Sequence, residues 1–475
     1  MSKSVATLSV LPPEWPEDLL DSIQEQVRVS DRKIVVLDDD PTGTQTVHGL
    51  PVLTTWAVED LQVELKSAFP AFYVLTNSRS LPQPAAQKLS REIGSHLKQA
   101  ATNTRVEIEV ISRSDSTLRG HFPAEVDALM QSMDTLAQPR ILIPFFLEGG
   151  RFTLNDIHYV AEGDQLIPAA QTPYARDTVF GYRHSDLRRW VEEKSEGRIP
   201  FHTVTSLSIE DLRKGGPQRV TERLHGLPAG SCCVVNAASY KDLEVFVSGL
   251  LAVEAMGRRF VFRTAASFVR VRAGIAARGL LTAPELVNDN CNGGLFVVGS
   301  HVPKTSAQLA LLRKTPDITS LEVNVSHMLD NDCRSREIRR VTEEVNNLIH
   351  NGHDVVLFTS RNLVSGVDGQ SSLRIGQCVS DALIAIVHGL AYQPRYLVAK
   401  GGITSSDIAT RGLGIRRAMI LGQLLPGVPV WRLGHETRYP GMAYIVFPGN
   451  VGEDDALAEI RKRLAPAGLS SRLIR

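Results

Sequence analysis

Cysteine is scarce in this 475-residue sequence, and its pattern argues against a disulfide framework. The five cysteines are an odd number, and none stands in a CxxC pair. Cys232 and Cys233 lie inside an apolar run that predicts a buried strand. We therefore expect reduced thiols with a structural role.

Long apolar runs and an excess of charge of either sign are also missing. No run is long enough to span a bilayer, and the N-terminal residues lack the continuous apolar core of a signal peptide. Lys plus Arg equals Asp plus Glu at 52 each, so no overall field favours nucleic acid or an anionic membrane. We expect a cytoplasmic protein with a small-molecule partner and with neither nucleic acid nor membrane as a partner, and self-association into a homo-oligomer is left open.

Short apolar runs alternate with amphipathic stretches along the chain, the pattern of an α/β fold with mostly parallel sheets. The chain is too long for a single core. We expect a lead-in over residues 1–30, a first α/β domain over 31–285 and a second over 293–475, with a ligand cleft between the two domains. The predicted strands are 33–37, 72–75, 106–111, 141–143, 232–235 and 260–262 in the first domain, and 295–298, 355–358, 396–399, 428–431 and 444–447 in the second.

Polar motifs follow the first three predicted strands, where a parallel sheet binds its ligands. Residues 38–45 read DDDPTGTQ, residues 76–80 read TNSRS, and residues 112–120 read SRSDSTLRG. Three successive carboxylates repel one another, so a folded site that holds them needs donors, a cation or a raised pKa. This arrangement suits a base or a metal anchor, and the alternative is an acidic turn that caps a helix.

Arginines accompany these motifs. A guanidinium group holds a carboxylate in a fixed bidentate geometry and would orient an acidic substrate for reaction elsewhere on its chain. The candidates are Arg79, Arg113, Arg119 and Arg151. Any one of them alone is typical of a surface ion pair, whereas four beside strand-end motifs favour an anionic substrate.

The second half contains three copies of a different motif, in which a strand is followed by glycines and then by the start of a helix. Residues 298–301, 398–407 and 447–452 follow this pattern, which presents backbone amides and the positive end of a helix dipole to a phosphate. None of the three matches GxGxxG or the Walker pattern. Each alone could be an ordinary connection in an α/β protein, but three in one domain favour a nucleotide.

Together these motifs resemble a known family, the four-carbon acid sugar kinases. The resemblance rests on DDDPTGTQT at 38–46, DSTLRG at 115–120, GGITS at 401–405 and PGNVG at 448–452, and it spans nearly the whole chain after the lead-in. It implies an N-terminal substrate-binding domain and a C-terminal nucleotide-binding domain. The implied reaction is transfer of phosphate from ATP, with Mg²⁺, to the terminal hydroxyl of threonate, erythronate or a 3-oxo-tetronate.

The resemblance and the arginine pattern also imply site residues. Asp39 or Asp115 is expected to be the catalytic proton acceptor, with neither ranked first, and Asp38 is expected to be structural; no metal ligand is assigned. The substrate side comprises Asp40, Thr42, Gly43, Arg79, Ser116 and Arg119. The nucleotide side comprises Ser300, Gly401, Gly402, Ile403, Thr404 and Gly449. Two positions depart from the family pattern, Phe447 and Arg113, where many relatives have lysine.

Two other functions fit parts of the sequence. A phosphatase of the haloacid dehalogenase type is suggested by Asp38-x-Asp40-x-Thr42 after an apolar strand. Against it, Gly43 stands where an apolar residue is expected, and the second half would be unexplained. The non-enzymatic alternative is a sugar-acid binding protein whose two lobes close on the ligand.

Overall fold

The structure is a computed structural model that describes residues 2–287, 290–361, 369–449 and 451–465. It divides into two compact units, which we call unit 1 (Met1–Ala277) and unit 2 (Arg278–Arg475). The division falls ahead of residue 285, the expected end of the first domain. Residues 288–289, which lie between the two expected domains, are outside the described residues.

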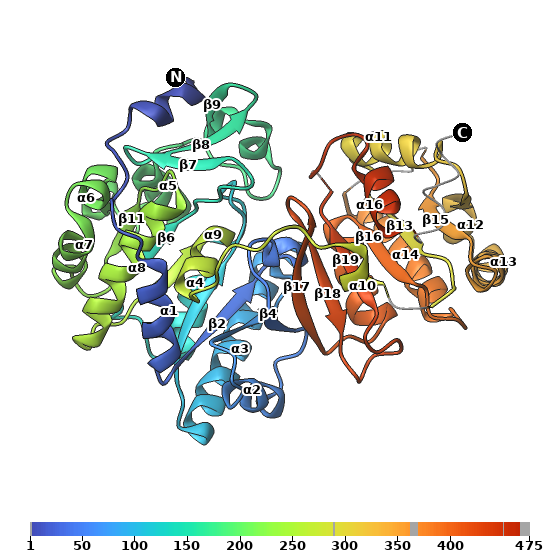
Figure 1. Cartoon of the computed structure of the whole chain (residues 1–475), viewed down its shortest axis with the longest axis horizontal. Coiled ribbons are helices and arrows are strands. Elements are labelled where there is room, and N and C mark those ends of the chain that lie inside the picture. The colour runs from blue at the N-terminus through green and yellow to red at the C-terminus, as the bar shows by residue number, and fades with distance from the viewer. Residues whose placement is uncertain (1, 288–289, 362–368, 450, 466–475) are drawn as a thin grey trace. The chain divides into compact units, whose positions relative to one another are not determined.

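Unit 1 contains a parallel sheet whose strands come from nearly its whole length (Figure 1). In spatial order its strands are β10 (Thr205–Leu207), β11 (Cys232–Val235), β6 (Arg140–Ile143), β12 (Val261–Thr264), β5 (Glu107–Arg113), β2 (Arg32–Asp38), β4 (Ala71–Leu75) and β3 (Leu50–Leu53). Every pairing in this order is parallel. The expectation of an α/β fold with mostly parallel sheets is confirmed.

Helices cover this sheet, because its strands are apolar on both faces. They are α1 (Leu20–Val29), α2 (Val58–Leu65), α3 (Gln83–Thr104), α4 (Ala124–Ser132), α5 (Leu187–Lys194), α6 (Ile209–Arg213), α7 (Gly216–His225), α8 (Tyr240–Ala255) and α9 (Ala266–Arg272). Leu61 of α2 and Ile93 of α3 pack on Phe72 and Val74 of β4. On another side, α1 packs against α8 and α9 (Figure 1). The residues expected to be a lead-in therefore contribute a helix to unit 1.

A small antiparallel sheet, absent from the sequence-based prediction, adds to unit 1. Its order is β1 (Lys3–Ser4), β9 (Gln165–Pro168), β8 (Ile157–Glu162) and β7 (Arg151–Leu154). Short 3₁₀ helices occur at Val5–Val10, Pro41–Thr44, Ser78–Ser80, Ala169–Gln171, Pro173–Arg176 and Phe201–Thr203.

Unit 2 contains a mixed sheet. Its order is β17 (Arg417–Leu425), β18 (Val428–Leu433), β19 (Ala443–Phe447), β16 (Tyr396–Lys400), β13 (Leu295–Val298), β15 (Asp354–Thr359) and β14 (Ile318–Val323). The strands from β19 to β14 pair in parallel, and β17 and β18 are antiparallel. The helices are α10 (Ala283–Leu286), α11 (Pro303–Leu312), α12 (Val325–Leu329), α13 (Asn331–His350), α14 (Gly369–His388), α15 (Gly402–Asp407) with a π-helical turn at Ile408–Gly412, and α16 (Ala456–Leu464).

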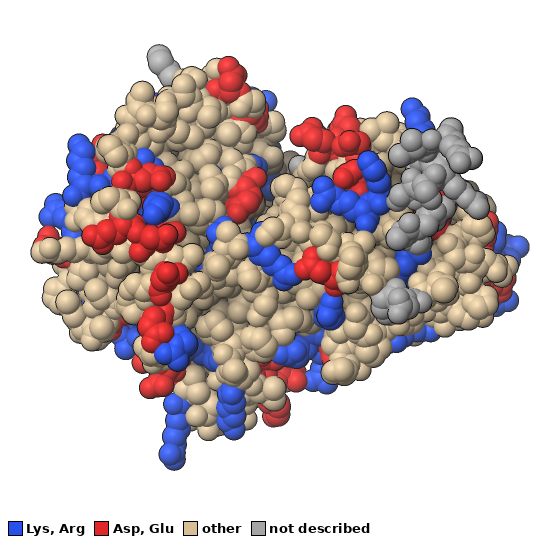
Figure 2. Space-filling model, viewed as in Figure 1, with Lys and Arg blue, Asp and Glu red and all other residues tan. Residues whose placement is uncertain are grey.

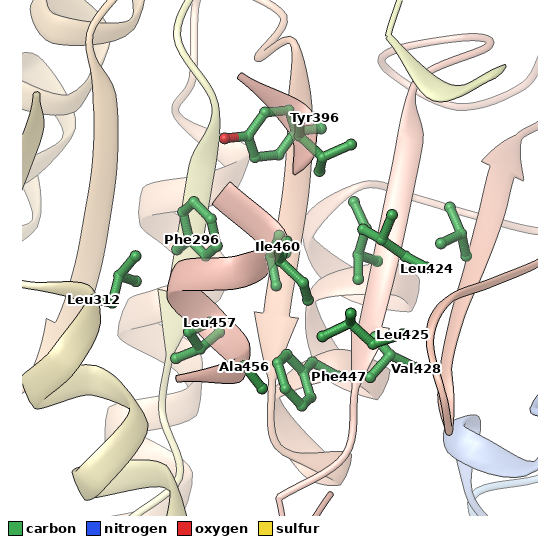
Figure 3. Packing of buried hydrophobic residues seen from close by; sticks show 14 of the residues in the cluster. Phe296, Leu312, Tyr396, Leu424, Leu425, Val428, Phe447, Ala456, Leu457 and Ile460 are labelled. Carbon is green, nitrogen blue, oxygen red and sulfur yellow. The ribbon is translucent and has the colours of Figure 1, made fainter. Parts of the chain in front are cut away.

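The core of unit 2 lies between this sheet and α16. Figure 3 shows Leu457 and Ile460 of α16 beside Phe296 and Phe447 of the sheet, and all four side chains are buried. This packing anchors β13 and β19, the strands that precede two of the three glycine turns.

The surface and the thiols agree with the composition. On the face drawn in Figure 2, acidic and basic side chains are interspersed, as the equal counts of 52 lead one to expect. Cys232 and Cys233 are free and buried in β11. None of the described helices combines the length and the apolar character that a bilayer span requires.

Candidate functional site

The polar motifs of unit 1 meet at the carboxyl edge of its parallel sheet, because the strands that precede them end in register. Asp38 of β2 lies opposite Leu75 of β4 and Arg113 of β5, and Arg113 lies opposite Thr264 of β12. The motifs that follow β2, β4 and β5 therefore leave the sheet side by side, as the sequence predicted for parallel strands. We call this cluster the acidic edge; it comprises residues 38–43, 78–79, 113–120 and 263–264.

Local hydrogen bonds shape the first turn of the acidic edge. The Asp40 side chain accepts a hydrogen bond from the Thr42 amide at 2.9 Å and caps the 3₁₀ helix Pro41–Thr44. The Thr42 hydroxyl donates to the same carboxylate. A Cβ atom at Gly43 would overlap the Asp38 carboxylate, so the turn requires glycine at this position.

Asp38 is held in the interior. It is 1% exposed, and Arg113 Nη1 lies 3.0 Å from its Oδ1. Burial raises the pKa of Asp38 to about 7 against the opposing charge of Arg113. Near neutral pH a fraction of the Asp38 population is therefore protonated.

Several hydrogen-bond donors contact the Asp115 carboxylate. Arg119 Nε lies 2.7 Å from Oδ2 and Arg79 Nη1 lies 3.4 Å from Oδ1, and the Thr117 hydroxyl donates to Oδ2. Arg79 also pairs with Asp40. Burial alone would raise the pKa of Asp115, but the guanidinium groups of Arg119 and Arg79 outweigh it and hold the pKa well below its usual range. A carboxylate in this state is a weak base.

Asp39 is buried as well, and its two carboxylate oxygens have different surroundings. It is 4% exposed, and its Oδ2 accepts a hydrogen bond from the Ser114 hydroxyl. Its Oδ1 is buried and has no hydrogen-bond partner among the described residues; Arg113 Nη1 lies 3.9 Å from it. Asp38 Oδ2 is the other buried aspartate oxygen of the acidic edge without a hydrogen-bond partner among the described residues, but Asp38 is paired with Arg113 at 3.0 Å through its second oxygen, whereas the corresponding Asp39 contact is 3.9 Å long.

The loop from Asp115 to Gly120 is fixed through its backbone. The Ser116 carbonyl oxygen accepts a hydrogen bond from His158 Nε2 at 2.7 Å, and the Thr117 carbonyl oxygen accepts one from the Tyr182 hydroxyl at 2.8 Å. His158 belongs to β8, so the small antiparallel sheet supports this loop.

One arginine candidate lies apart from this cluster of ion pairs. Arg151 begins β7, and its guanidinium lies 5.8 Å from the centre of the Tyr174 ring, which Arg119 also approaches at 5.2 Å. The structure therefore joins Arg79, Arg113 and Arg119 to the carboxylates and leaves Arg151 outside.

The glycine turns of unit 2 also meet at one sheet edge. Lys400 of β16 lies opposite Val298 of β13 and Phe447 of β19, so the loops that follow the three strands are neighbours. Gly401 has φ +115°, and a Cβ there would lie 3.0 Å from the Ser300 Cβ, so the chain passes close to Ser300 only because this residue is glycine.

Hydroxyl groups connect these turns. The Thr305 hydroxyl donates to the Gly449 carbonyl oxygen at 3.1 Å and lies 3.4 Å from Ser300 Oγ. Gly402, Ile403 and Thr404 form the first turn of α15 beside this contact, and the Ile403 side chain is exposed. The residues expected on the nucleotide side therefore lie together in unit 2.

Comparison with known proteins places this arrangement in a family. A model described as a sugar-binding N-terminal domain matches residues 34–272, and one described as a nucleotide-binding C-terminal domain matches residues 295–457. A D-erythronate kinase of Heliobacterium modesticaldum is 26% identical over 417 residues, which cover 84% of this chain and 87% of the relative. A 3-oxo-tetronate kinase of Methylobacterium radiotolerans is 27% identical over 439 residues, which cover 88% and 96%.

The chain belongs to the four-carbon acid sugar kinase family. It is a phosphotransferase that acts on an alcohol group. A solved structure from Salmonella typhimurium LT2, of a protein described as a candidate tRNA synthase, shares the fold: its TM-score is 0.66 at 17% identity, and the match covers 91% of this chain and 99% of that one.

Sequence reasoning missed a residue on the sugar-binding side of this kinase, Arg263 of β12. It is 4% exposed and donates to the carbonyl oxygens of Arg119 at 3.0 Å and Thr264 at 3.4 Å. Burial lowers its pKa to about 10, with the charges of Asp39 and Asp115 opposing the shift. Among the described residues no carboxylate forms an ion pair with it. Arg263 directly follows the predicted strand 260–262, but no polar motif accompanies it there, so it was not selected.

Lys400 was missed on the nucleotide-binding side of the kinase. It is fully buried, its Nζ donates to the Pro448 carbonyl oxygen at 2.7 Å, and the ammonium lies 3.7 Å from the centre of the Phe447 ring. Burial, with a smaller contribution from the charge of Lys304, lowers the pKa of Lys400 to about 7. A basic group therefore lies against Phe447, the position where the family pattern led us to expect a lysine.

Proposed function

We propose that this kinase transfers the γ-phosphate of ATP to the terminal hydroxyl of a four-carbon sugar acid, namely threonate, erythronate or a 3-oxo-tetronate. The relatives named D-erythronate kinase and 3-oxo-tetronate kinase support the substrate class. The observation that carries the proposal is the acidic edge, where paired charges surround Asp39, whose Oδ1 has no hydrogen-bond partner among the described residues.

The charges of this edge suit an anionic acceptor. Four arginines, which are Arg79, Arg113, Arg119 and Arg263, face four aspartates, which are residues 38, 39, 40 and 115. Because burial raises the pKa of Asp38 to about 7, the balance near neutral pH leans toward positive charge. A sugar-acid carboxylate is attracted to such an edge, and we propose that Arg79 and Arg119 contact it together with Asp40, Thr42, Gly43 and Ser116.

We propose Asp39 as the proton acceptor. A general base needs an oxygen within hydrogen-bond reach of the acceptor hydroxyl and a pKa suited to taking its proton. Asp39 Oδ1 has no partner among the described residues, whereas both oxygens of Asp115 are engaged and its pKa is strongly depressed. Asp115 then acts by positioning Arg79 and Arg119.

The nucleotide is proposed to bind at the glycine turns of unit 2, through Ser300, residues 401–404 and Gly449. Turns that begin helices present backbone amides to phosphate oxygens. Phosphoryl transfer needs the two substrates to be positioned and the developing negative charge to be stabilised.

Mg²⁺ is proposed to accompany the nucleotide. Mg²⁺ in such enzymes is held largely by water and substrate phosphates with one or two carboxylates. In the described part of the chain no group of three or more His, Cys, Asp or Glu side chains is arranged to hold a metal ion. The residues present therefore fit an ion carried on the phosphates, whose charge it would neutralise when bound, better than a metal held in a protein cage.

The phosphatase alternative fits the geometry poorly. Its nucleophile would be Asp38, which is buried, paired with Arg113 and has a pKa near 7. Its second aspartate would be Asp40, which is engaged by Thr42 and Arg79. Asp38 keeps one oxygen without a hydrogen-bond partner among the described residues, but its burial, its pairing with Arg113 and its raised pKa make it a poor nucleophile, and Asp40 is engaged.

The proposal is tested by an assay of ADP release from ATP and Mg²⁺ over a panel of threonate, erythronate and 3-oxo-tetronate isomers. We expect ADP formation that depends on one or a few of these acids. Controls without acid measure background hydrolysis, and a parallel assay follows phosphate release from the corresponding phosphate esters. If the protein binds ATP but consumes it with none of the acids on the panel, the proposed substrate class is excluded. Hydrolysis of the phosphate esters in the absence of ATP would favour the phosphatase alternative.

A further inference from the structure

Arg361 lies at the edge of unit 2 that carries the glycine turns, two residues after β15. Its Nη2 donates to the Ser306 hydroxyl at 2.5 Å. Its Nε and Nη1 atoms are buried, and neither has a hydrogen-bond acceptor among the residues that the structure describes. A guanidinium group has five N–H donors in a rigid plane, so most of the donors of Arg361 remain available.

The charge of Arg361 is also uncompensated. No described carboxylate forms an ion pair with it, and burial lowers its pKa with no anion opposing the shift. Burial, and then the charge of Arg361, lower the pKa of His301, so this neighbour supplies no negative charge to Arg361. A partly buried cation without a partner is unfavourable by itself and becomes favourable when an anion binds.

Short contacts connect Arg361 to the turns expected to bind the nucleotide. Ser306, its hydrogen-bond partner, follows Thr305 in the first turn of α11. The Thr305 hydroxyl contacts both Ser300 and the Gly449 carbonyl oxygen. His301 Nε2 lies 3.2 Å from the hydroxyl of Thr359, the last residue of β15, so the loop that contains Ser300 also contacts the strand that carries Arg361.

The other cations near this edge already have partners. The loop 447–452 contains no basic residue. Lys304 lies 3.6 Å from Asp454, and Lys400 donates to the Pro448 carbonyl oxygen. Charge stabilisation of a nucleotide polyphosphate requires a cation. Among the described residues Lys400 also lacks a paired carboxylate, but it is fully buried and its pKa is lowered to about 7, whereas Arg361 is partly exposed and stays charged.

Resting on the function proposed above, we propose that Arg361 binds the polyphosphate chain of the nucleotide, with its buried N–H groups donating to phosphate oxygens. The planar fork of arginine matches two phosphate oxygens at once, which the ammonium of lysine cannot do. Arg361 then discriminates nucleotides by their phosphates rather than by their base.

The test compares affinities of ATP, ADP and AMP for the full chain by calorimetry, in the wild type and in Arg361→Gln and Arg361→Lys. We expect Arg361→Gln to weaken ATP binding about 10- to 100-fold, which is the loss typical of one charge-assisted hydrogen bond, while AMP binding changes little. Arg361→Lys should recover part of the ATP affinity, because it restores the charge without the fork. Arg340→Gln is the matched control, since Arg340 is an exposed arginine of the same unit that pairs with Glu337.

The outcomes separate this inference from the proposed function. An ATP-to-AMP affinity ratio that stays at the wild-type value in a folded Arg361→Gln variant would overturn the role of Arg361. A loss of ATP and AMP affinity by the same factor would also overturn the role of Arg361, because that pattern indicates a general disturbance of the unit. Wild-type protein that binds none of the three nucleotides would instead overturn the proposed function itself.

Discussion

Replacing Asp39 by asparagine removes one charge from the acidic edge and keeps the shape of the side chain. The amide oxygen can still accept the hydrogen bond that the Ser114 hydroxyl donates to Asp39 Oδ2. The amide nitrogen then takes the place of Oδ1, the oxygen that has no hydrogen-bond partner in the described structure. An amide cannot take the proton from the hydroxyl group of the sugar acid, so we expect kcat to fall by about 100-fold or more. The melting temperature should change little, because no ion pair shorter than 3.9 Å is lost.

Asp115→Asn should behave in the opposite way. It removes the charge that pairs with Arg119 at 2.7 Å and Arg79 at 3.4 Å. A hydrogen bond to a charged group contributes about 1.5–3 kcal/mol, so a loss of about 2–3 kcal/mol is expected for this partly exposed group. At roughly 2–4 °C per kcal/mol for a domain of this size, the melting temperature should fall by about 5–10 °C. KM for the sugar acid should rise, and kcat should fall less than in Asp39→Asn.

The two variants need three measurements: steady-state kinetics with the preferred acid, thermal unfolding, and ATP binding as a control that should not change. The contribution of Asp115 to the free energy of unfolding should also depend on pH. Because its pKa is depressed in the folded state, the stabilisation is complete above its unfolded pKa of about 4 and is lost as the pH falls below that value. Full turnover in a folded Asp39→Asn variant, with loss of turnover but not of stability in Asp115→Asn, would reverse the roles assigned here.

Two further predictions concern unit 2. Gly401→Ala adds a Cβ to a residue with φ +115° and places it 3.0 Å from the Ser300 Cβ, so calorimetry should show an ATP affinity reduced at least tenfold while sugar-acid binding is unchanged. An unchanged ATP affinity would show that this turn is not part of the nucleotide site. Burial lowers the pKa of Lys400 to about 7, so the unfolded chain binds more protons than the folded one between pH 7 and its unfolded pKa of about 10.4. The free energy of unfolding should therefore rise with pH across this window, by on the order of 4 kcal/mol, and urea titrations should show a flatter dependence in Lys400→Met; equal slopes would contradict the assignment.

The central strands were predictable because buried parallel strands are continuous apolar runs. The strand expected at 33–37 is β2 (Arg32–Asp38), and the one expected at 232–235 is β11 itself. The convergence of the motifs after β2, β4 and β5 followed from the same reasoning, since parallel strands end at one edge. Other strands were not predicted, because their sequences are shorter or less continuously apolar than those of the central strands. They are the four strands of the small antiparallel sheet, the parallel strands β3, β10 and β14, and the nine-residue strand β17.

The roles of individual side chains depend on contacts that sequence patterns do not record. The sequence could not rank Asp39 against Asp115, because the ranking depends on which carboxylate the arginines reach. Arg263 stands alone after the predicted strand 260–262, and only the structure shows that its guanidinium donates to the carbonyl oxygen of Arg119, 144 positions earlier in the chain. Long-range contacts of this kind decide whether a polar residue is free to act.

The two units solve the problem of anion binding differently. In unit 1 the carboxylates and guanidinium groups largely neutralise one another, so we expect selection of a small acid to depend on the geometry of the paired groups and on Asp39 Oδ1, which has no hydrogen-bond partner among the described residues. In unit 2 the described edge holds Lys400 and Arg361 without a paired carboxylate, and burial lowers the pKa of both. Such an edge gains most from a polyanion, because a bound anion relieves the cost of burying unpaired positive charge. This difference in charge compensation supports assigning the sugar acid to unit 1 and the nucleotide to unit 2 on physical grounds, independently of the family resemblance.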